Sequence, residues 1–276
     1  MAFVNSIKVT YSNYSRAIKI GFYSPVAYFC HKVKLMKNSI HKNSFKLIIL
    51  VSGRGSNMSS IIKNSMLLNW PIEILAVIAD RDCNAINLAK KLSVPTVILD
   101  YKRFRNSKRF NIELFSVVAS FNPDLVALAG FMRILNQEQL SCSKHIFLNI
   151  HPSILPKYKG LNTHKRVLTG NETFHGATVH SVTGDLDDGP IICQGVVPVL
   201  PEDNEALLAA RVLDMELKIY PSAIAAILSK KIVFKSGVWV KSEKAIDLPA
   251  FYFSKIVFHP YFSKHEKEKI VEKLVF

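Results

Sequence analysis

The chain has 276 residues, of which 49% are hydrophobic, and its formal net charge is +15. This length and composition suffice for a sizeable buried core and exclude a chain that is disordered throughout. More than half of the net charge lies in the first 46 residues, which hold eight lysines and arginines and no acidic residue. The rest of the chain is therefore only moderately basic.

Residues 1–44 show no helical or strand period, and we predict a basic extension that does not join the core. Its lack of acidic residues is typical of an organellar transit peptide. A start site placed too far upstream explains the segment equally well, because Met36 stands ten residues before the first clear strand. On either reading we expect residues 1–35 to be dispensable for stability and turnover.

From Lys46 onward, continuous apolar runs alternate with segments of helical period. Such runs are typical of strands buried on both faces of a parallel sheet. The predicted strands are 47–51, 72–79, 96–99, 125–129 and 145–150, and the predicted helices between them are 57–68, 84–92 and 108–121. This alternation predicts an α/β fold, with a Rossmann-like, mostly parallel twisted sheet and helices on both faces.

The second half adds a helix at about 163–169, strands near 175–182 and 191–198, and a long helix at about 204–229. A short strand at 238–240 precedes a tail to residue 276 in which we find no assignable pattern. We therefore expect an N-terminal extension at 1–44, a catalytic domain with some mixed strands at 45–231, and a C-terminal edge strand and tail at 232–276.

No uninterrupted apolar run approaches the roughly 20 residues that a membrane span needs, so we expect a soluble protein that does not bind membranes. The four cysteines contain no Cys-x-x-Cys pair, and the sequence suggests no metal site. We interpret them as reduced thiols, which favours the cytoplasm, or an organelle if residues 1–44 are a transit peptide.

In open α/β sheets, ligands bind beyond the carboxyl ends of the strands. The first such end carries Ser52-Gly53-Arg54-Gly55-Ser56-Asn57. Glycines there let the backbone approach an anion, and the following helix offers unpaired N–H groups to a phosphate. The competing interpretation is that the glycines serve only the geometry of a strand-to-helix turn.

His151 follows the fifth predicted strand, and Asn149 projects from the same strand face two residues earlier. Together they supply a general acid/base and a hydrogen-bond donor for a carbonyl oxygen. A carboxylate that could assist them lies in the acidic loop 183–190, although such loops are usually solvated turns.

Several strings together resemble the phosphoribosylglycinamide (GAR) transformylases, which are folate-dependent formyltransferases. They are Ser52-Gly53-Arg54-Gly55-Ser56-Asn57, Ala129-Gly130-Phe131-Met132-Arg133-Ile134-Leu135, Asn149-Ile150-His151-Pro152-Ser153, His175-Gly176-Ala177-Thr178-Val179-His180 and Leu186-Asp187-Asp188-Gly189-Pro190. The resemblance covers about residues 46–230. It implies the formyltransferase fold and the transfer of a formyl group from 10-formyltetrahydrofolate, as co-substrate, to the amine of GAR in purine biosynthesis.

The resemblance also implies roles for individual residues. Asn149, His151 and Asp187 correspond to the catalytic triad. The substrate phosphate is expected to bind to Gly55, Ser56 and Asn57, and the ribose hydroxyls are expected to bind to Glu216. The folate pteridine falls to two segments, which are Met132, Arg133, Ile134 and Leu135, and Thr183, Gly184, Asp185, Leu186 and Asp187, with Asn149 beside them.

Two positions depart from the family pattern. An arginine that contacts the folate tail in some members aligns with Ser107, so that Arg105, Lys108 or Arg109 has to replace it. Asp188 stands where a glycine is common, which adds negative charge beside the catalytic loop.

Other functions were weighed against this interpretation. Methionyl-tRNA formyltransferase and formyltetrahydrofolate deformylase share the fold, but the first requires a C-terminal nucleic-acid-binding domain and the second a folded domain ahead of residue 46. A noncatalytic nucleic-acid-binding protein would suit the pI of about 9.6, yet the charge lies mainly in the extension and no such motif is present. We expect small-molecule substrates, no nucleic acid, and a monomer or homodimer.

Overall fold

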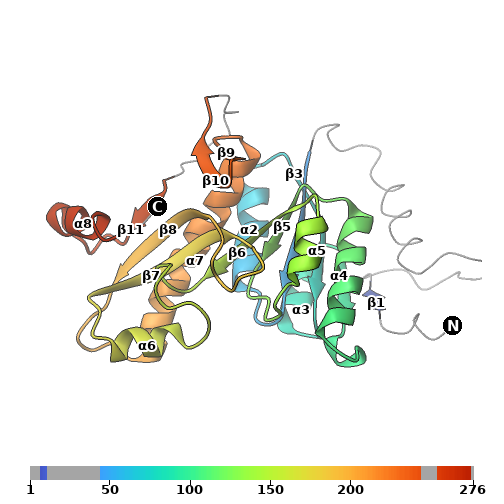
Figure 1. Ribbon diagram of the computed structural model, residues 1–276, viewed down its shortest axis with the longest axis horizontal. Helices are drawn as coiled ribbons and strands as arrows, with labels where there is room; N and C mark the ends of the chain where they lie inside the picture. The colour runs from blue at the N-terminus through green and yellow to red at the C-terminus, as the bar shows by residue number, and fades with distance from the viewer. Residues whose placement is uncertain (1–6, 11–43, 244–253, 275–276) are drawn as a thin grey trace, which may run out of the picture. The chain divides into compact units, whose positions relative to one another are not determined.

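The computed structural model describes residues 7–10, 44–243 and 254–274 (Figure 1). The chain forms two compact units, one from residues 1–62 and 71–147 and the other from residues 63–70 and 148–276.

The first unit contains a sheet whose central strands are buried on both faces. Its strands are β2 (Phe45–Val51), β3 (Ile72–Ala79), β4 (Thr96–Leu99) and β5 (Leu125–Leu128), and they are ordered β4-β3-β2-β5 with parallel pairing throughout. All five residues from Leu47 to Val51 are fully buried, as the continuous apolar run predicts. The carboxyl ends of these strands therefore lie along one edge.

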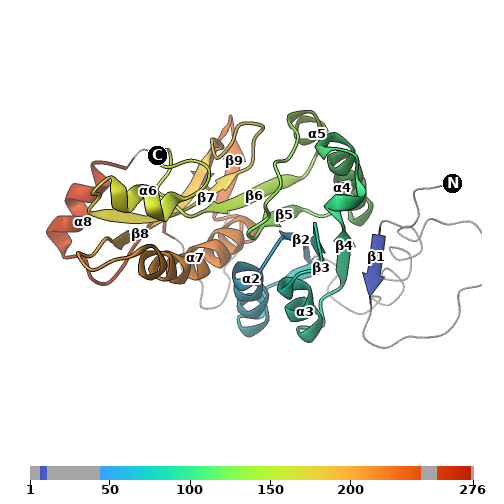
Figure 2. The ribbon, with the colours of Figure 1, turned by 90° about the horizontal axis from the view of Figure 1, so that it is seen from below.

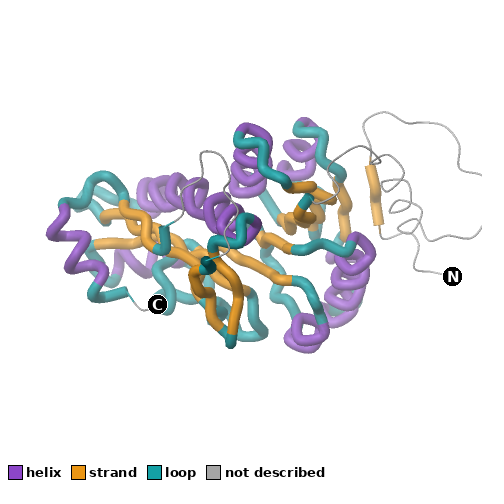
Figure 3. Tube along the Cα trace, turned by 90° about the horizontal axis from the view of Figure 1, so that it is seen from above, coloured by secondary structure: helices purple, strands orange, loops and turns teal. Residues whose placement is uncertain are grey.

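Helices lie on both sides of this sheet (Figures 2 and 3). They are α2 (Ser56–Leu67), α3 (Asn84–Lys91), α4 (Ser107–Phe121) and the short α5 (Gln137–Cys142), with a 3₁₀ turn at Tyr101–Arg103. Asparagines mark both ends of α4. At its beginning, the Asn106 side chain accepts a hydrogen bond from the Arg109 N–H, and at its end the Asn122 backbone is left-handed, with φ of 48°. The predicted βα alternation is confirmed.

The second unit is mainly antiparallel. Its strands β6 (Ile146–His151), β7 (Phe174–Ser181) and β8 (Ile191–Pro198) are neighbours in that order. The 24-residue helix α7 (Glu205–Leu228) packs along β7 and β8, and α6 (Thr163–Thr169) connects β6 to β7 (Figure 1). The mixed strands expected in the second half are confirmed.

The predicted strand at 238–240 is present as β10 (Val238–Lys241), but it pairs with β9 (Ile232–Lys235), which was not predicted, in a separate two-stranded sheet. The turn between them is Ser236-Gly237, with φ of 49° and 82°, the two positive values that a tight two-residue hairpin requires.

The tail, in which the sequence shows no assignable pattern, contains a strand and a helix. β11 (Ile256–Phe258) pairs parallel with β8, and α8 (Lys264–Val271) begins with a capping box between Ser263 and Glu266. Phe262 and Ile270 pack into one apolar cluster with Ile154, which lies three residues after His151. The tail thus contacts the segment that follows His151.

The N-terminal extension holds one strand, β1 (Ile7–Thr10), which pairs antiparallel with β4. The expectation of no strand there is wrong for these four residues, while the rest of the extension lies outside the described residues. Among the described helices, none has both the length and the apolar character needed to cross a bilayer.

Candidate active site

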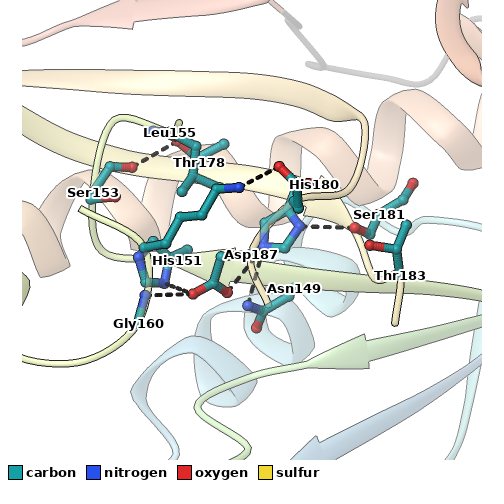
Figure 4. Close-up of polar contacts among 12 residues, drawn as sticks. Asn149, His151, Ser153, Leu155, Gly160, Thr178, His180, Ser181, Thr183 and Asp187 are labelled. Carbon is teal, nitrogen blue, oxygen red and sulfur yellow. Dashed lines mark hydrogen bonds and ion pairs between the residues drawn. The ribbon is translucent and has the colours of Figure 1, made fainter. Parts of the chain in front are cut away.

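Strand β6 and its neighbour β7 bring the predicted catalytic groups together. His151 is the last residue of β6, rather than the first residue beyond it, and Asn149 lies two positions earlier on the same face. In the β6–β7 pair, Asn149 stands directly opposite His180. Cross-strand partners have neighbouring side chains, and Asn149 Nδ2 lies 3.3 Å from His180 Nε2 (Figure 4).

His151 is 5% exposed and contacts oxygen atoms at both ring nitrogens. Its Nδ1 lies 3.3 Å from Asp187 Oδ2 (Figure 4). Its Nε2 lies 2.9 Å from the Tyr158 carbonyl oxygen. A carboxylate and a carbonyl only accept hydrogen bonds. The ring satisfies both contacts when each nitrogen carries a proton, as a general acid requires.

Asp187 reaches this histidine from the loop after β7. Its side chain is 8% exposed, and its Oδ2 also accepts a 2.9 Å hydrogen bond from the Gly160 N–H. Its Oδ1 lies 3.8 Å from His180 Nε2. The backbone of Asp187 is left-handed, with φ of 51°, a conformation that costs free energy in a non-glycine residue and is concentrated at functional sites.

A buried polar network holds the segment that follows His151. Thr178 Oγ1 donates to the Ser153 carbonyl at 2.7 Å and accepts from the Leu155 N–H at 3.1 Å and from Gln194 Nε2 at 3.0 Å. A hydroxyl has one donor and two acceptor positions, so Thr178 is fully satisfied. Gln194 also donates to the Leu155 carbonyl at 2.9 Å. Strands β7 and β8 thereby fix the backbone that follows His151.

Two further histidines pair inside the same unit. His164 Nδ1 and His175 Nε2 lie 3.2 Å apart. Burial lowers the pKa of His175 to about 3, and burial also lowers the pKa of His164. Both rings are therefore neutral near pH 7, which allows one to donate and the other to accept.

Ion pairs tie the loop 156–162 to its surroundings. Lys159 pairs with Asp188, and Lys157 and the Tyr158 hydroxyl both contact Glu172, at 3.0 and 2.9 Å. The negative charge that Asp188 adds at a position where glycine is common is therefore balanced by Lys159. The Arg166 guanidinium donates to the Lys159 carbonyl at 2.6 Å.

In the first unit, the predicted phosphate loop follows β2. Gly55 has φ of 83°, and a Cβ there would lie 2.8 Å from the Cβ of Ala85 in α3. Geometry alone thus requires glycine at this position, and a substitution would disturb packing before it affected any ligand. Ser56 and Asn57 are the first two residues of α2, and a helix N-terminus favours an anion.

The segment after β5 carries the predicted folate residues. The Met132 N–H donates to Ser52 Oγ at 2.8 Å, which anchors the backbone, while the side chains of Met132 and Ile134 are 62% and 67% exposed and Leu135 is buried. Exposed apolar side chains on an anchored backbone suit a flat aromatic ligand.

The Arg133 side chain is engaged within its own unit. It pairs with Asp80, and its guanidinium lies 3.9 Å from the centre of the Tyr101 ring. Burial by itself raises the pKa of Asp80, but hydrogen bonds from Arg81 and Arg133 outweigh burial and hold that pKa below 3.8. Asp80 was not singled out from the sequence, and its position directly after β3 is the signal that could have found it.

The remaining predicted residues lie within the second unit. Glu216 is a buried acid on α7. Thr183, Gly184, Asp185 and Leu186 form the loop that leads to Asp187, and Leu186 is 54% exposed. His180 and Thr178 were missed as individual site residues, because in the sequence they read as positions of an ordinary strand.

Two features indicate the class of protein. They are the parallel sheet of the first unit and the group of Asn149, His151 and Asp187 at the end of β6. Residues 45–224 match the family described as formyl transferase, and the chain belongs to that family.

The relatives sharpen this assignment. The phosphoribosylglycinamide formyltransferase of Escherichia coli is 35% identical over 200 residues, which cover 72% of this chain and 94% of that enzyme. The human trifunctional purine biosynthetic protein adenosine-3 is 36% identical over 209 residues, which cover 74% of this chain but only 21% of the human protein. A solved phosphoribosylglycinamide formyltransferase from Coxiella burnetii has a TM-score of 0.70 and 34% identity, covering 79% of this chain and all of that one.

Proposed function

We propose that the protein transfers the formyl group of 10-formyltetrahydrofolate to the amine of 5′-phosphoribosylglycinamide. The observation that carries the proposal is the contact of Asp187 with His151 beside Asn149 at the end of β6. It is supported by the match to 94% of the length of the Escherichia coli phosphoribosylglycinamide formyltransferase. An acid, a carboxylate and an amide donor are the groups that acyl transfer to an amine needs.

The two substrates bring different chemistry to the binding residues. For the phosphate of GAR, we propose the N–H groups and side chains of Gly55, Ser56 and Asn57, because helix N-termini favour anions. Glu216 is proposed for the ribose hydroxyls, because a carboxylate accepts two hydrogen bonds from a diol.

For the folate, we propose the segments 132–135 and 183–187, with Arg105, Lys108 or Arg109 for its anionic tail. The exposed Met132, Ile134 and Leu186 side chains supply apolar area for the pteridine. The folate provides the formyl group; the chain binds it, orients it and moves protons.

The catalytic roles follow from where charge develops. As the amine attacks the formyl carbon, the formyl oxygen becomes negative, and the Asn149 amide and the His151 proton stabilise it. The attacking amine loses a proton, and the departing folate nitrogen gains one. Asp187 stabilises the positive ring of His151 during this relay.

The Tyr158 carbonyl shapes this proposal. It occupies His151 Nε2 at 2.9 Å, so donation from Nε2 to the formyl oxygen requires that oxygen to take the place of the carbonyl. Substrate binding is therefore linked to a shift of the loop 156–162, which carries Tyr158.

The test is a spectrophotometric assay of formyl-folate consumption with three acceptors offered separately: GAR, methionyl-tRNA and water. The proposal requires consumption that depends on GAR and yields formyl-GAR in equal amount. Consumption without GAR, with release of formate, would instead indicate a deformylase, and dependence on methionyl-tRNA would indicate a tRNA formyltransferase.

A further inference from the structure

A chain of hydrogen bonds connects the β9–β10 hairpin with the Asn149 amide, entirely within the second unit. Trp239 Nε1 donates to Ser181 Oγ at 2.8 Å, and His180 Nδ1 lies 2.8 Å from the Ser181 carbonyl oxygen. His180 Nε2 then faces Asn149 Nδ2 at 3.3 Å. Trp239 is 5% exposed and lies beyond residues 45–224, the part that matches the family.

The neighbours of His180 decide where its single proton lies. The ring is 2% exposed, and burial lowers its pKa, so it is neutral near pH 7. The Ser181 carbonyl only accepts and lies at hydrogen-bond distance from Nδ1, whereas Asp187 Oδ1 lies 3.8 Å from Nε2, beyond that distance, so Nδ1 carries the proton and Nε2 keeps a lone pair. Asn149 must then turn its NH₂ group toward His180, because its carbonyl oxygen would face that lone pair.

This orientation matters for the chemistry at Asn149. One hydrogen of Nδ2 is used by His180, which leaves the second hydrogen for a substrate oxygen. An Asn149 amide turned by 180° would present its oxygen to His180 and lose this arrangement. His180 therefore fixes which end of the Asn149 amide donates.

Ser181 is held in place by contacts with three residues. The Ser181 N–H donates to the Pro190 carbonyl at 3.0 Å, and a Cβ at Gly189 would overlap the Ser181 carbonyl oxygen. The register of the β7–β8 pair shifts between Val179 and His180, and such irregularities re-aim side chains beside active sites. The Trp239 indole completes the grip on Ser181 through the hydroxyl.

We propose that Trp239, Ser181 and His180 are positioning residues that orient the Asn149 amide for the formyl oxygen. This inference rests on the proposed function, because it assumes that Asn149 acts on the transferred group. It assigns the hairpin, outside the family match, a part in turnover rather than in folding alone.

The experiment measures kcat and KM for Trp239→Phe in the wild-type background and in an Asn149→Ala background. Phe keeps an aromatic ring but removes the N–H. We expect kcat to fall about 3- to 10-fold in the wild-type background, the range that one hydrogen bond spans, with both KM values nearly unchanged, and no further fall in the Asn149→Ala background. Ser181→Ala should reproduce the loss and Ser181→Thr should restore activity.

Two controls separate positioning from general damage. Trp70→Phe alters the other tryptophan, which is 6% exposed, and should change kcat in neither background. Nitrogen NMR of histidine-labelled protein should show the His180 proton on Nδ1, a readout that does not depend on formyl transfer.

An equal fall in both backgrounds, no fall in the wild-type background, an equal effect of Trp70→Phe, or a His180 proton on Nε2 would overturn the positioning proposal. Absence of GAR-dependent formyl transfer by the unmodified protein would overturn the proposed function, and the NMR result would still report on His180.

Discussion

Around His151, in the second unit, burial lowers the pKa of three further histidines and keeps them neutral, whereas in the first unit Asp80 keeps its charge between Arg81 and Arg133. Both regions are buried and polar. One avoids the cost of a buried charge by staying neutral, and the other offsets that cost by pairing.

The difference fits the work proposed for each region. Neutral histidines such as His180 have one donor and one acceptor, and so can fix the direction of a hydrogen bond. A guanidinium only donates and a carboxylate only accepts. Such an ion pair holds a backbone segment in place, but its hydrogen-bonding roles do not depend on its neighbours. The comparison also predicts that the two regions respond differently to acid and to loss of a carboxylate.

The largest effect is expected from Asp187→Asn, which keeps the shape of the side chain and removes the charge that faces His151. We expect turnover to fall by at least about 100-fold, as general acid/base contributions do, while the fold and GAR affinity are largely kept. Steady-state kinetics and circular dichroism check both parts.

Glu202→Gln is the matched control, because Glu202 is an exposed acid of the second unit that lies outside the proposed binding segments. It should leave turnover within about threefold, too little for an acid/base role. If Asp187→Asn behaved like this control, Asp187 would be an ordinary loop residue and the catalytic carboxylate would have to be sought at Asp185 or Asp188.

Asp80→Asn should act on stability rather than on chemistry. It removes the carboxylate shared by Arg81 and Arg133, and we expect a loss of about 2 kcal/mol of unfolding free energy, since the pair is partly exposed on the Arg81 side. Urea denaturation measures it. Asp82→Asn, an exposed neighbour, should cost almost nothing; equal losses would mean that the ion pairs contribute little.

Mild acid should weaken the second unit before the first. The pKa of His175 falls from 6.5 to about 3 on folding, so the unfolded chain binds this proton more readily. The stability that its neutral state contributes is complete above pH 6.5 and is lost as the pH falls toward 3. Asp80, whose pKa lies below 3.8, contributes its stability down to lower pH.

We therefore expect about 1 kcal/mol to be lost between pH 6.5 and 5.5, with faster hydrogen exchange in β7 and α6 than in β3 and β5. His175→Gln should flatten this pH dependence even if it lowers stability overall. Equally fast hydrogen exchange in β3 and β5 over the same pH range would contradict the comparison between the two units.

The smallest effect is expected from a chain that starts at Met36. It removes β1, and the hydrogen bonds that β1 makes to β4 are largely offset by the entropy of ordering four residues, so we expect a cost below about 1 kcal/mol. Turnover should stay within twofold. A larger loss of either would show that the extension contributes substantially to the stability or the turnover of the protein.

Some of the molecule could be read directly from the sequence. The buried run at 47–51 identified β2 because only a strand covered on both faces is apolar at every position. The candidate catalytic residues were proposed because Asn149 and His151 stand on one strand face, and Asp187 was added by the family resemblance; the structure places the three side chains together.

Other features carried a signal that was overlooked. The Ser236-Gly237 turn marks the β9–β10 hairpin, and Ser263 followed by Glu266 marks the start of α8. Both are short-range patterns, but neither stands beside a strong apolar period, so only the strand at 238–240 was predicted in this part of the chain.

The role of His180 could not be predicted in this way. It depends on the β6–β7 register, which places His180 opposite Asn149, and on the irregularity beside Val179. Register is set by pairing between strands far apart in the chain, and a strand sequence alone does not specify it.

The central claim is that His151 and Asp187 act as one catalytic unit, and a double-mutant cycle tests it most directly. Turnover with GAR and 10-formyltetrahydrofolate is measured for His151→Ala, Asp187→Asn and the two combined. Residues that act together are not additive, so the double variant should be little slower than the slower single variant. Losses that multiply would show that the two side chains contribute independently, and would contradict the account.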